Sequence, residues 1–398
     1  MTSTYMCFVC MCEELVWKHV GGNGLLPCDG RKKFAWNKSG LYRRITMNLS
    51  CYKDKRILVT GHTGFKGSWM SMLLLELGAN VYGYAQEPPT NPSMFKLCGL
   101  QDKMTSYRGD IRDLEHLQGV FEEVQPEIVI HMAAQPLVRD SYKHPVYTYE
   151  TNVIGTVNVL ECVRKTDSVK SVVNVTTDKV YKNIEQNAGY VETDELNGYD
   201  PYSNSKSCSE LVTSSYINSF LRDKGVAVST VRAGNVIGGG DFAADRIIPD
   251  CVRAAMTGKD IMIRNPYSIR PFQHVLEPVA AYLMIAVEQW CDEKKCGSYN
   301  IGPKDEDCWE TGKLTDLFCD TWESVFGEKV HWINQHDDGP HEAGFLKLDC
   351  TKAHCVFGWE PKWNMKTNME KIVQWTKVYA DGGDVSKETV RQIREYLG

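Results

Sequence analysis

A tyrosine and a lysine four residues apart, Tyr202 and Lys206, have the clearest chemical logic in this sequence. Residues four apart lie on one face of a helix, so a helix beginning near Tyr202 would bring the two side chains together. A phenol with an unperturbed pKa of about 10 is a poor base at neutral pH, but a neighbouring ammonium, together with a bound cationic cofactor, would lower that pKa. The pair is therefore predicted to take a proton from a hydroxyl group while hydride leaves the carbon that bears it.

A second group of polar residues, Thr177, Asp178 and Lys179, follows an apolar run at 171–175. We expect this group to lie in a loop after the strand, facing the cleft that also contains Tyr202. Asp178 can protonate a departing hydroxide if partial burial raises its pKa, and Lys179 can act as a base only if desolvation or a neighbouring cation lowers its pKa. The alternative is a strand-end Asp that caps backbone N–H groups beside a solvated Lys. The residues alone leave both interpretations open.

Three glycines, Gly61, Gly64 and Gly67, lie between a strand-like run at 56–60 and a helix predicted over 64–77. Glycines in this context allow a tight turn, a close approach of the backbone to a diphosphate, and packing of the helix on the sheet. The helix N-terminus adds N–H groups and the positive end of its dipole. The context favours a dinucleotide site over a plain turn.

The dinucleotide fingerprint also expects an acid about 20 residues further on, at the end of the second strand. That position holds Tyr84-Ala85-Gln86, and Glu87 comes slightly later. The residues therefore predict dinucleotide binding but leave NAD and NADP both open.

Two arginines stand in polar loops of the second half of the chain, Arg246 in 244–249 and Arg270 in 269–274. Arginine suits bidentate binding of a diphosphate, although a surface salt bridge is the alternative for each. Nearby His274 is interpreted as a structural histidine and not as a catalyst.

The composition is that of an ordinary globular protein. The 398 residues are 42% hydrophobic and 24% charged, with a net charge of −6. No basic face for nucleic acid is predicted, and no apolar run approaches the roughly 20 residues needed to span a bilayer. The 15 cysteines are scattered without framework spacing, which indicates a reducing compartment. We expect a cytoplasmic protein with no membrane or nucleic-acid partner.

Strand-like and helical segments alternate from residue 53 onward. This alternation predicts an α/β fold, a doubly wound parallel sheet (Rossmann) over residues 53–235. Residues 236–398 are expected to form a smaller C-terminal α/β domain for the substrate, with some interleaving. The predicted strands are 56–60, 80–84, 128–132, 226–231 and two that end at Asp110 and Thr177; the predicted helices are 64–77, 114–124, about 146–165, one from Tyr202, 369–379 and 387–397.

Residues 1–52 differ from the rest because they are basic, cysteine-containing and without periodicity. Cys7, Cys10, Cys12 and Cys28 raise the possibility of zinc, but no second ligand pair has finger or ribbon spacing. A basic leader is another option, which Glu13 and Glu14 argue against. We expect a poorly ordered extension or an upstream start, with Met47 beginning the domain, and no metal site.

The motifs of this sequence resemble those of the extended short-chain dehydrogenase/reductases that act on nucleotide sugars. The residues that carry the resemblance are Gly61–Gly67, Asp110-Ile111, Ala133-Ala134, Thr177-Asp178 and Tyr202-x-x-x-Lys206. More narrowly, the sequence is similar to the CDP-glucose branch of the nucleotide-sugar 4,6-dehydratases, through the runs Gly61–Trp69, Ala133–Arg139, Thr177–Lys179, Gly234–Asp241 and Arg270–Pro278. The resemblance covers about residues 48–375 and leaves out residues 1–46.

The resemblance implies NAD as cofactor, CDP-glucose as substrate and a homodimer. Tyr202, aided by Lys206, would take the O4 proton while the C4 hydride moves to NAD. Water would leave across C5–C6 and the stored hydride would return to C6. Thr177 would bond to the O4 region and Asp178 would protonate the leaving C6 hydroxyl. The expected catalytic residues are Thr177, Asp178, Lys179, Tyr202 and Lys206; the expected cofactor-binding residues are Gly61, Gly64, Phe65, Gly67, Asp110, Ile111, Ala133, Ala134, Tyr202 and Lys206; the expected substrate-binding residues are Arg139, Asn235, Arg246 and Arg270.

Lys179 departs from the dTDP-glucose enzymes, in which a Glu after the Asp removes the C5 proton. The CDP-glucose branch resembles this sequence in having Lys there, which supports the substrate and leaves the C5 base open. A 4-epimerase or another nucleotide-sugar dehydratase remains an alternative, although an epimerase needs no acid at C6. A cofactor sensor without catalysis would not need Tyr202, Lys206 and Asp178 together.

Overall fold

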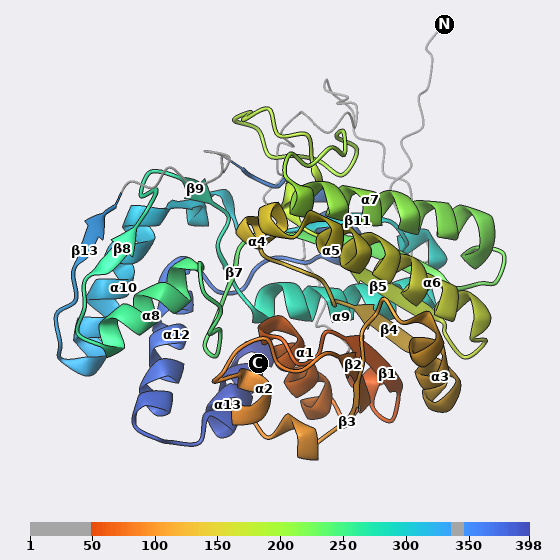
Figure 1. Cartoon of the computed structure of the whole chain (residues 1–398), viewed down its shortest axis with the longest axis horizontal. Helices are drawn as coiled ribbons and strands as arrows, with labels where there is room; N and C mark the ends of the chain where they lie inside the picture. The colour runs from red at the N-terminus through yellow and green to blue at the C-terminus, as the bar shows by residue number, and fades with distance from the viewer. Residues whose placement is uncertain (1–48, 336–345) are drawn as a thin grey trace, which may run out of the picture. The chain divides into compact units, whose positions relative to one another are not determined.

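A parallel sheet of seven strands runs through residues 49–335 and 346–398, the part of the chain that the computed structural model describes (Figure 1). The strands are β1 (Arg56–Thr60), β2 (Asn80–Ala85), β3 (Thr105–Arg108), β4 (Ile128–His131), β5 (Ser171–Val175), β6 (Ala227–Ala233) and β11 (Ser298–Ile301). Their order is β11-β6-β5-β4-β1-β2-β3, with every neighbouring pair parallel. The chain starts in the middle and winds outward in both directions, so the predicted fold class is confirmed.

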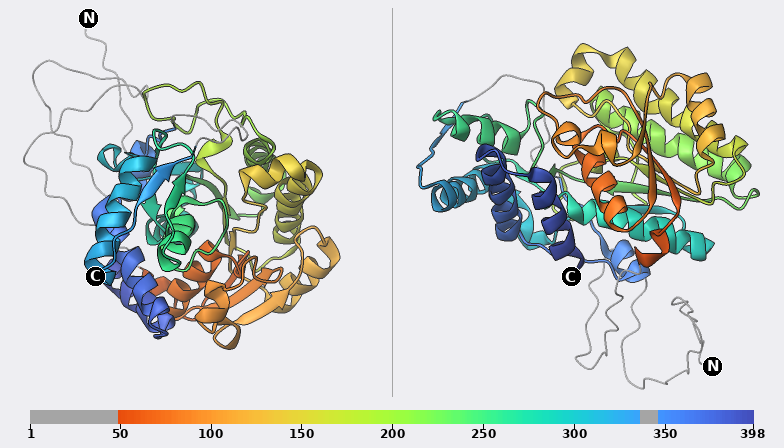
Figure 2. Two further views of the ribbon diagram at one scale, coloured as in Figure 1. Left: turned by 60° about the vertical axis from the view of Figure 1, so that its left-hand side comes forward. Right: turned by 90° about the horizontal axis from the view of Figure 1, so that it is seen from below.

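Helices cover both faces of the sheet, as Figures 1 and 2 show. Alternate strand residues supply two separate cores, because successive side chains point to opposite faces. Ile57 and Val59 pack on the side of α1 (Phe65–Glu76) and α9 (Leu276–Cys291), whereas Leu58 packs on the side of α3 (Leu114–Val124) and α6 (Gly155–Lys165). The helices of this half are α1 (Phe65–Glu76), α2 (Met94–Leu97), α3 (Leu114–Val124), α4 (Val138–Lys143), α5 (Pro145–Tyr149), α6 (Gly155–Lys165), α7 (Pro201–Tyr216) and α9 (Leu276–Cys291).

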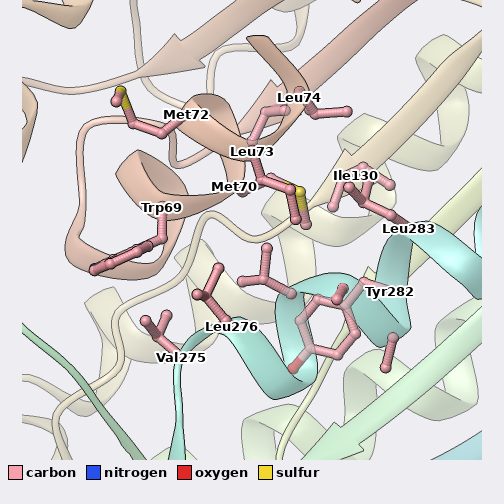
Figure 3. Packing of buried hydrophobic residues seen from close by; sticks show 14 of the residues in the cluster. Trp69, Met70, Met72, Leu73, Leu74, Ile130, Val275, Leu276, Tyr282 and Leu283 are labelled. Carbon is pink, nitrogen blue, oxygen red and sulfur yellow. The ribbon is translucent and has the colours of Figure 1, made fainter. Parts of the chain in front are cut away.

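The core under α1 fixes the position of the glycine-rich turn. Figure 3 shows Trp69, Met70 and Leu73 of α1 gathered with Leu276 and Tyr282 of α9 in one buried cluster. All five side chains are fully buried. Burial of an aliphatic side chain of this size stabilises a fold by about 1.5–3 kcal/mol. The N-terminus of α1 is therefore held rigidly against the sheet.

The folded region begins before residue 53. Residues Leu49–Tyr52 form the short helix η1, and the Tyr52 side chain is fully buried, with its hydroxyl donating to the Leu283 carbonyl at 2.7 Å. Tyr52 therefore packs into the folded region, although a single aromatic anchor carries no periodic signal, and the boundary at residue 53 stays a prediction. The cysteines considered for zinc lie outside the described residues. No helix of the described ranges is long and apolar enough to cross a membrane.

The chain after residue 235 builds a second group of elements around its own core. Ile248, Phe318, Trp322 and Met369 are buried there together. β11 and α9 also follow residue 235, but β11 is a strand of the central sheet and α9 packs against β5 and β6, so the two expected units interleave and the division at 235 stays a prediction. The elements outside the sheet are β7 (Val236–Ile237), β8 (Ile261–Ile263), β9 (Ile269–Arg270), β10 (Gln273–His274), β12 (Trp309–Glu310), β13 (Trp332–Asn334), α8 (Ile247–Met256), α10 (Thr311–Phe326), α11 (Thr351–Phe357), α12 (Met365–Ala380) and α13 (Val385–Leu397).

The long helix expected over 146–165 is interrupted in its middle. Between α5 and α6 the chain forms one wide π-helical stretch, η3 (Glu150–Ile154). Asn152 within it accepts from the Gln135 backbone N–H at 2.8 Å and donates to the Ser205 hydroxyl at 2.9 Å. A π turn re-aims a side chain within a helix, and here it ties the helix to the loop after β4.

Candidate active site

A cavity of about 1340 Å³ opens where the chain leaves the carboxyl ends of β1, β4, β5 and β6. Residues 244–250 and 262–270 of the second group of elements close its other side. In doubly wound sheets this edge is the usual place for ligands. Pockets for one small ligand measure about 300–1,000 Å³, so this volume suits two ligands side by side.

Every residue that the sequence predicted for the site lines this one cavity. The catalytic candidates in the lining are Thr177, Asp178, Lys179, Tyr202 and Lys206; the cofactor candidates are Gly61, Gly64, Phe65, Gly67, Asp110, Ile111, Ala133 and Ala134; the substrate candidates are Arg139, Asn235, Arg246 and Arg270. His274, interpreted as structural, lies outside the lining. It is fully buried between Trp69 and Trp363.

Two of the three glycines in the turn are required by the protein's own packing. Gly61 has a φ of +77°, and a Cβ on it would lie 2.8 Å from the Ala133 backbone. A Cβ on Gly67 would lie 2.1 Å from the Gly61 carbonyl oxygen. Neither backbone neighbour can yield easily.

Gly64 differs, because a Cβ there would meet only the Gly61 oxygen, at an ordinary 3.5 Å. Gly64 also precedes α1 without a side-chain cap, so the first N–H groups of the helix have no capping acceptor. The turn thus offers donors and a bare backbone toward the cavity. These features fit the diphosphate of a dinucleotide.

Asp110 is fixed at the rim of the cavity by Arg112 and Gln86. Arg112 Nη2 donates to Asp110 Oδ2 at 2.7 Å, and Gln86 Nε2 donates to the same oxygen at 2.7 Å. Burial acts to raise the pKa of this carboxyl, but the hydrogen bonds from Arg112 and Gln86 hold it below its usual range. Glu87, the acid that follows the second strand, instead pairs with Arg108 at 2.9 Å.

The Tyr202 and Lys206 pair sits on the first two turns of α7. Asp200 caps this helix by accepting from the Ser203 N–H at 3.0 Å, and Pro201 occupies its first turn. An acidic cap followed by Pro is a strong helix start, which explains why α7 begins here. Lys206 is 4% exposed and donates to the Val175 carbonyl at 3.0 Å.

Burial pushes both members of the pair toward their neutral forms. It raises the pKa of Tyr202 to about 12, with Asp178 acting in the same direction and a hydrogen bond with Thr177 and the charge of Arg246 opposing. Burial also lowers the pKa of Lys206 to about 8, against the charge of Glu210. The lowering of the Tyr202 pKa expected from the sequence also depends on the positive charge of the bound nicotinamide, so it stays a prediction.

Thr177 links Tyr202 to the buried carboxylate of Asp178. Its hydroxyl shares a hydrogen bond with Tyr202 and donates to Asp178 Oδ1 at 2.9 Å. Asp178 is 1% exposed, and its Oδ2 has no hydrogen-bond partner among the described residues. Lys179 Nζ lies 3.8 Å from Asp178 Oδ1 and is 30% exposed. A buried carboxylate oxygen without a partner indicates an interaction with a ligand group.

The predicted arginines approach the cavity from the second group of elements. Arg246 Nη1 donates to Asp241 Oδ2 at 3.0 Å, and Arg270 is 7% exposed. Nothing in the sequence marked Asp241 as the carboxylate that positions Arg246.

Sequence reasoning also missed two charged residues near the reacting groups. Lys66, inside the glycine motif, lines the cavity with its ammonium 5.8 Å from the Tyr282 ring centroid. Burial, with the charges of Arg246 and Lys206, lowers its pKa to about 7. Glu210 carried a usable signal, because it follows Lys206 by four residues on the same helix.

Comparisons with known proteins agree with this geometry. A sequence profile described as GDP-mannose 4,6 dehydratase matches residues 58–372. The chain is 48% identical over 352 residues to CDP-glucose 4,6-dehydratase of Salmonella typhimurium, covering 87% of this chain and 97% of that protein. It is 25% identical to dTDP-glucose 4,6-dehydratase of Haemophilus influenzae, covering 80% and 97%.

Solved structures share the fold at lower identity. The UDP-glucose 4-epimerase of Thermus thermophilus, in complex with NAD, superposes with a TM-score of 0.70 at 23% identity, covering 81% of this chain and 99% of that chain. The dTDP-glucose 4,6-dehydratase of Bacillus anthracis, in complex with NAD, gives 0.68 at 22% identity, covering 83% and 99%. The extent of the profile match and the identity to the Salmonella protein place the chain by descent, and it belongs to the GDP-mannose 4,6-dehydratase family, the nucleotide-sugar dehydratases of the extended short-chain dehydrogenase/reductases.

Proposed function

We propose that the chain converts CDP-glucose to CDP-4-keto-6-deoxyglucose and water, with NAD as a cofactor that is regenerated in each turnover. The observation that carries this proposal is the cavity itself. It joins a dinucleotide-type turn, the Tyr202 and Lys206 pair, and the buried Asp178 with an unpartnered oxygen. The 48% identity to a CDP-glucose 4,6-dehydratase over nearly all of both chains supports the substrate.

The protein's part in the oxidation is to remove a proton from O4. NAD, held at the Gly61–Gly67 turn, supplies the hydride acceptor for C4 and the donor for C6. Tyr202 takes the O4 proton, and Thr177, hydrogen-bonded to Tyr202, holds the same oxygen. Arg246 and Lys206 provide positive charge around the phenolate that this step needs.

The elimination uses the neighbouring Asp178 and Lys179. The 4-ketone acidifies the C5 hydrogen, and Lys179 in its neutral form accepts it while protonated Asp178 gives a proton to the leaving C6 hydroxyl. One proton arrives and one departs, so the step releases water and leaves Lys179 charged and Asp178 ionised. When hydride returns to C6, Lys179 gives its proton back to C5. The proton that Tyr202 took from O4 then passes through the Thr177 hydroxyl to Asp178, so all three groups are restored for the next turnover.

Substrate binding is assigned to the charged residues on the far side of the cavity. Arg246 and Arg270 suit the diphosphate of the nucleotide sugar, since guanidinium groups bind phosphate oxygens bidentately. We assign Arg139 and Asn235, which line the same cavity, to the hexose. All four of these residues line the cavity.

The test is incubation with CDP-, dTDP-, UDP- and GDP-glucose, followed by mass spectrometry. Loss of one water from CDP-glucose, with a C4 deuterium recovered on the C6 methyl group, is the expected result. An unchanged mass with a changed sugar configuration would indicate an epimerase. No turnover of any of the four sugars would overturn the proposal.

We further propose a cytoplasmic homodimer. Val146 of α5, Ile154 of η3 and Leu211 of α7 are 69%, 50% and 58% exposed, and α5 and η3 also border a shallow apolar hollow. Apolar side chains gathered on one helical face are typical of a contact between subunits. Light scattering should give a dimer, and Leu211→Asp should give a monomer; a monomeric parent protein would contradict the assignment.

A further inference from the structure

A buried ion pair contacts Thr176, the residue before the catalytic candidates Thr177 and Asp178. Glu210 follows Lys206 by one turn of α7, and Arg232 lies on β6. Arg232 Nε donates to Glu210 Oε1 at 3.0 Å, and Nη2 donates to Oε2 at 3.0 Å. Both side chains are 3% exposed. A buried bidentate pair is held in one geometry.

Further hydrogen bonds fix the Glu210 carboxylate. Thr176 donates to Oε1 at 2.5 Å, and Thr230 donates to Oε2 at 2.6 Å. Arg232 is anchored in turn, because its Nη1 donates to the Tyr181 hydroxyl at 2.8 Å. Every group around the carboxylate is a donor, which matches an ionised Glu210.

The groups that face Lys206 come from four elements. Lys66 of α1 is a like charge, and His131 of β4 is neutral at ordinary pH because burial lowers its pKa to about 3. The Val175 carbonyl of β5 accepts from Nζ. Glu210 of α7 is the anion, and within the described residues Lys206 forms no direct ion pair.

We propose that Glu210 is a positioning residue for the dehydration reaction: its fixed carboxylate keeps the buried Lys206 charged beside Tyr202, and Arg232 keeps that carboxylate in place. This role rests on the proposed function, because it acts through the Tyr202 proton transfer. The direction of the electrostatics agrees, since burial lowers the pKa of Lys206 and the charge of Glu210 acts against that lowering.

The test is the pH dependence of kcat/KM for Glu210→Gln. With the carboxylate removed, Lys206 loses its proton at lower pH. The alkaline limb of the profile, where kcat/KM falls at high pH, should therefore move to lower pH by about one unit or more. Thr230→Val is the matched control, since it removes a hydrogen bond to the same carboxylate but no charge. Its alkaline limb should stay in place even if kcat falls.

A second variant guards against loss of folding. Glu210→Gln alone leaves the Arg232 charge buried without a partner, so Glu210→Gln with Arg232→Gln is tested beside it, and circular dichroism checks the fold of each. Glu210→Asp, which keeps the charge, should retain the wild-type limb. The double variant decides, because the unpaired Arg232 charge could by itself shift the alkaline limb in Glu210→Gln; an alkaline limb that is unmoved in the double variant overturns this role. If the wild-type protein turns over no nucleotide sugar, no pH profile can be measured, and that result would count against the proposed function instead.

Discussion

Substitution of single glycines in the turn at 61–67 should separate cofactor binding from folding. In Gly64→Ala the new methyl group meets only the Gly61 oxygen, at 3.5 Å, and the backbone angles of −77° and 172° suit alanine. The lost N-cap preference should lower the free energy of unfolding by about 0.5–1 kcal/mol. The methyl group also stands over the N–H groups of α1, where the diphosphate must approach.

The expected loss is therefore in affinity for the dinucleotide. A charge-assisted hydrogen bond contributes about 1.5–3 kcal/mol. If the methyl group moves the diphosphate enough to break one such bond, the Kd of NAD should rise by about 10- to 100-fold. Calorimetric titration with NAD measures the Kd, and thermal unfolding without cofactor measures stability. Gly64→Ala should unfold close to the wild-type Tm.

Gly67→Ala is the contrasting variant. Its methyl group would lie 2.1 Å from the Gly61 oxygen and 2.7 Å from the His62 Cα, both of them backbone atoms. Overpacking of this kind destabilises a protein by about 1–3 kcal/mol or more, which a helix-propensity gain of about 1 kcal/mol only partly offsets. Its Tm should fall by several degrees. Equal Kd values for wild type and Gly64→Ala, or equal Tm losses for the two variants, would refute the assignment of Gly64 to cofactor binding and of Gly67 to folding.

Three further outcomes are expected. Tyr202→Phe should reduce turnover by at least about 100-fold while the NAD Kd stays near the wild-type value, and retained activity would remove Tyr202 from its role. Asp178→Asn should slow water loss more than oxidation, so rapid-quench analysis should find a 4-keto sugar that still carries its C6 oxygen; its absence would count against Asp178 as the acid. Burial raises the pKa of Glu277 to about 7 in the folded protein. A carboxyl group with a raised folded-state pKa contributes stability below its unfolded pKa, and that stability is lost as pH rises to about 7. The free energy of unfolding of Glu277→Gln should therefore rise by about 2.5 kcal/mol relative to wild type between pH 5 and pH 8. A difference in the free energy of unfolding between the two proteins that stays constant from pH 5 to pH 8 would contradict the raised pKa of Glu277.

Elements whose signals are local could be predicted from the sequence. The strand 56–60 coincides with β1, because an apolar run buried on both faces has few other interpretations. The helix 114–124 coincides with α3, whose start is fixed by Asp113 accepting from the His116 N–H at 3.0 Å. The site residues gathered in one cavity because each stands where a strand ends or a helix begins.

Features that depend on distant contacts could not be predicted. The π turn at 150–154 depends on Asn152 bonding to Gln135 and Ser205, which lie in other elements. Burial of Tyr52 depends on a carbonyl of α9 more than two hundred residues away. No periodicity or cap encodes such contacts.

The proton-transfer chemistry depends on the same kind of distant contact. Spacing places Lys206 beside Tyr202, but burial raises the pKa of Tyr202 to about 12 and lowers that of Lys206 to about 8. Arg246 acts against the first shift and Glu210 against the second. Arg246 is itself held by Asp241, so the base strength of Tyr202 is set partly by residues outside the helix α7 that carries it. Substitutions at Arg246 or Glu210 should therefore impair proton transfer while leaving Tyr202 and Lys206 in place.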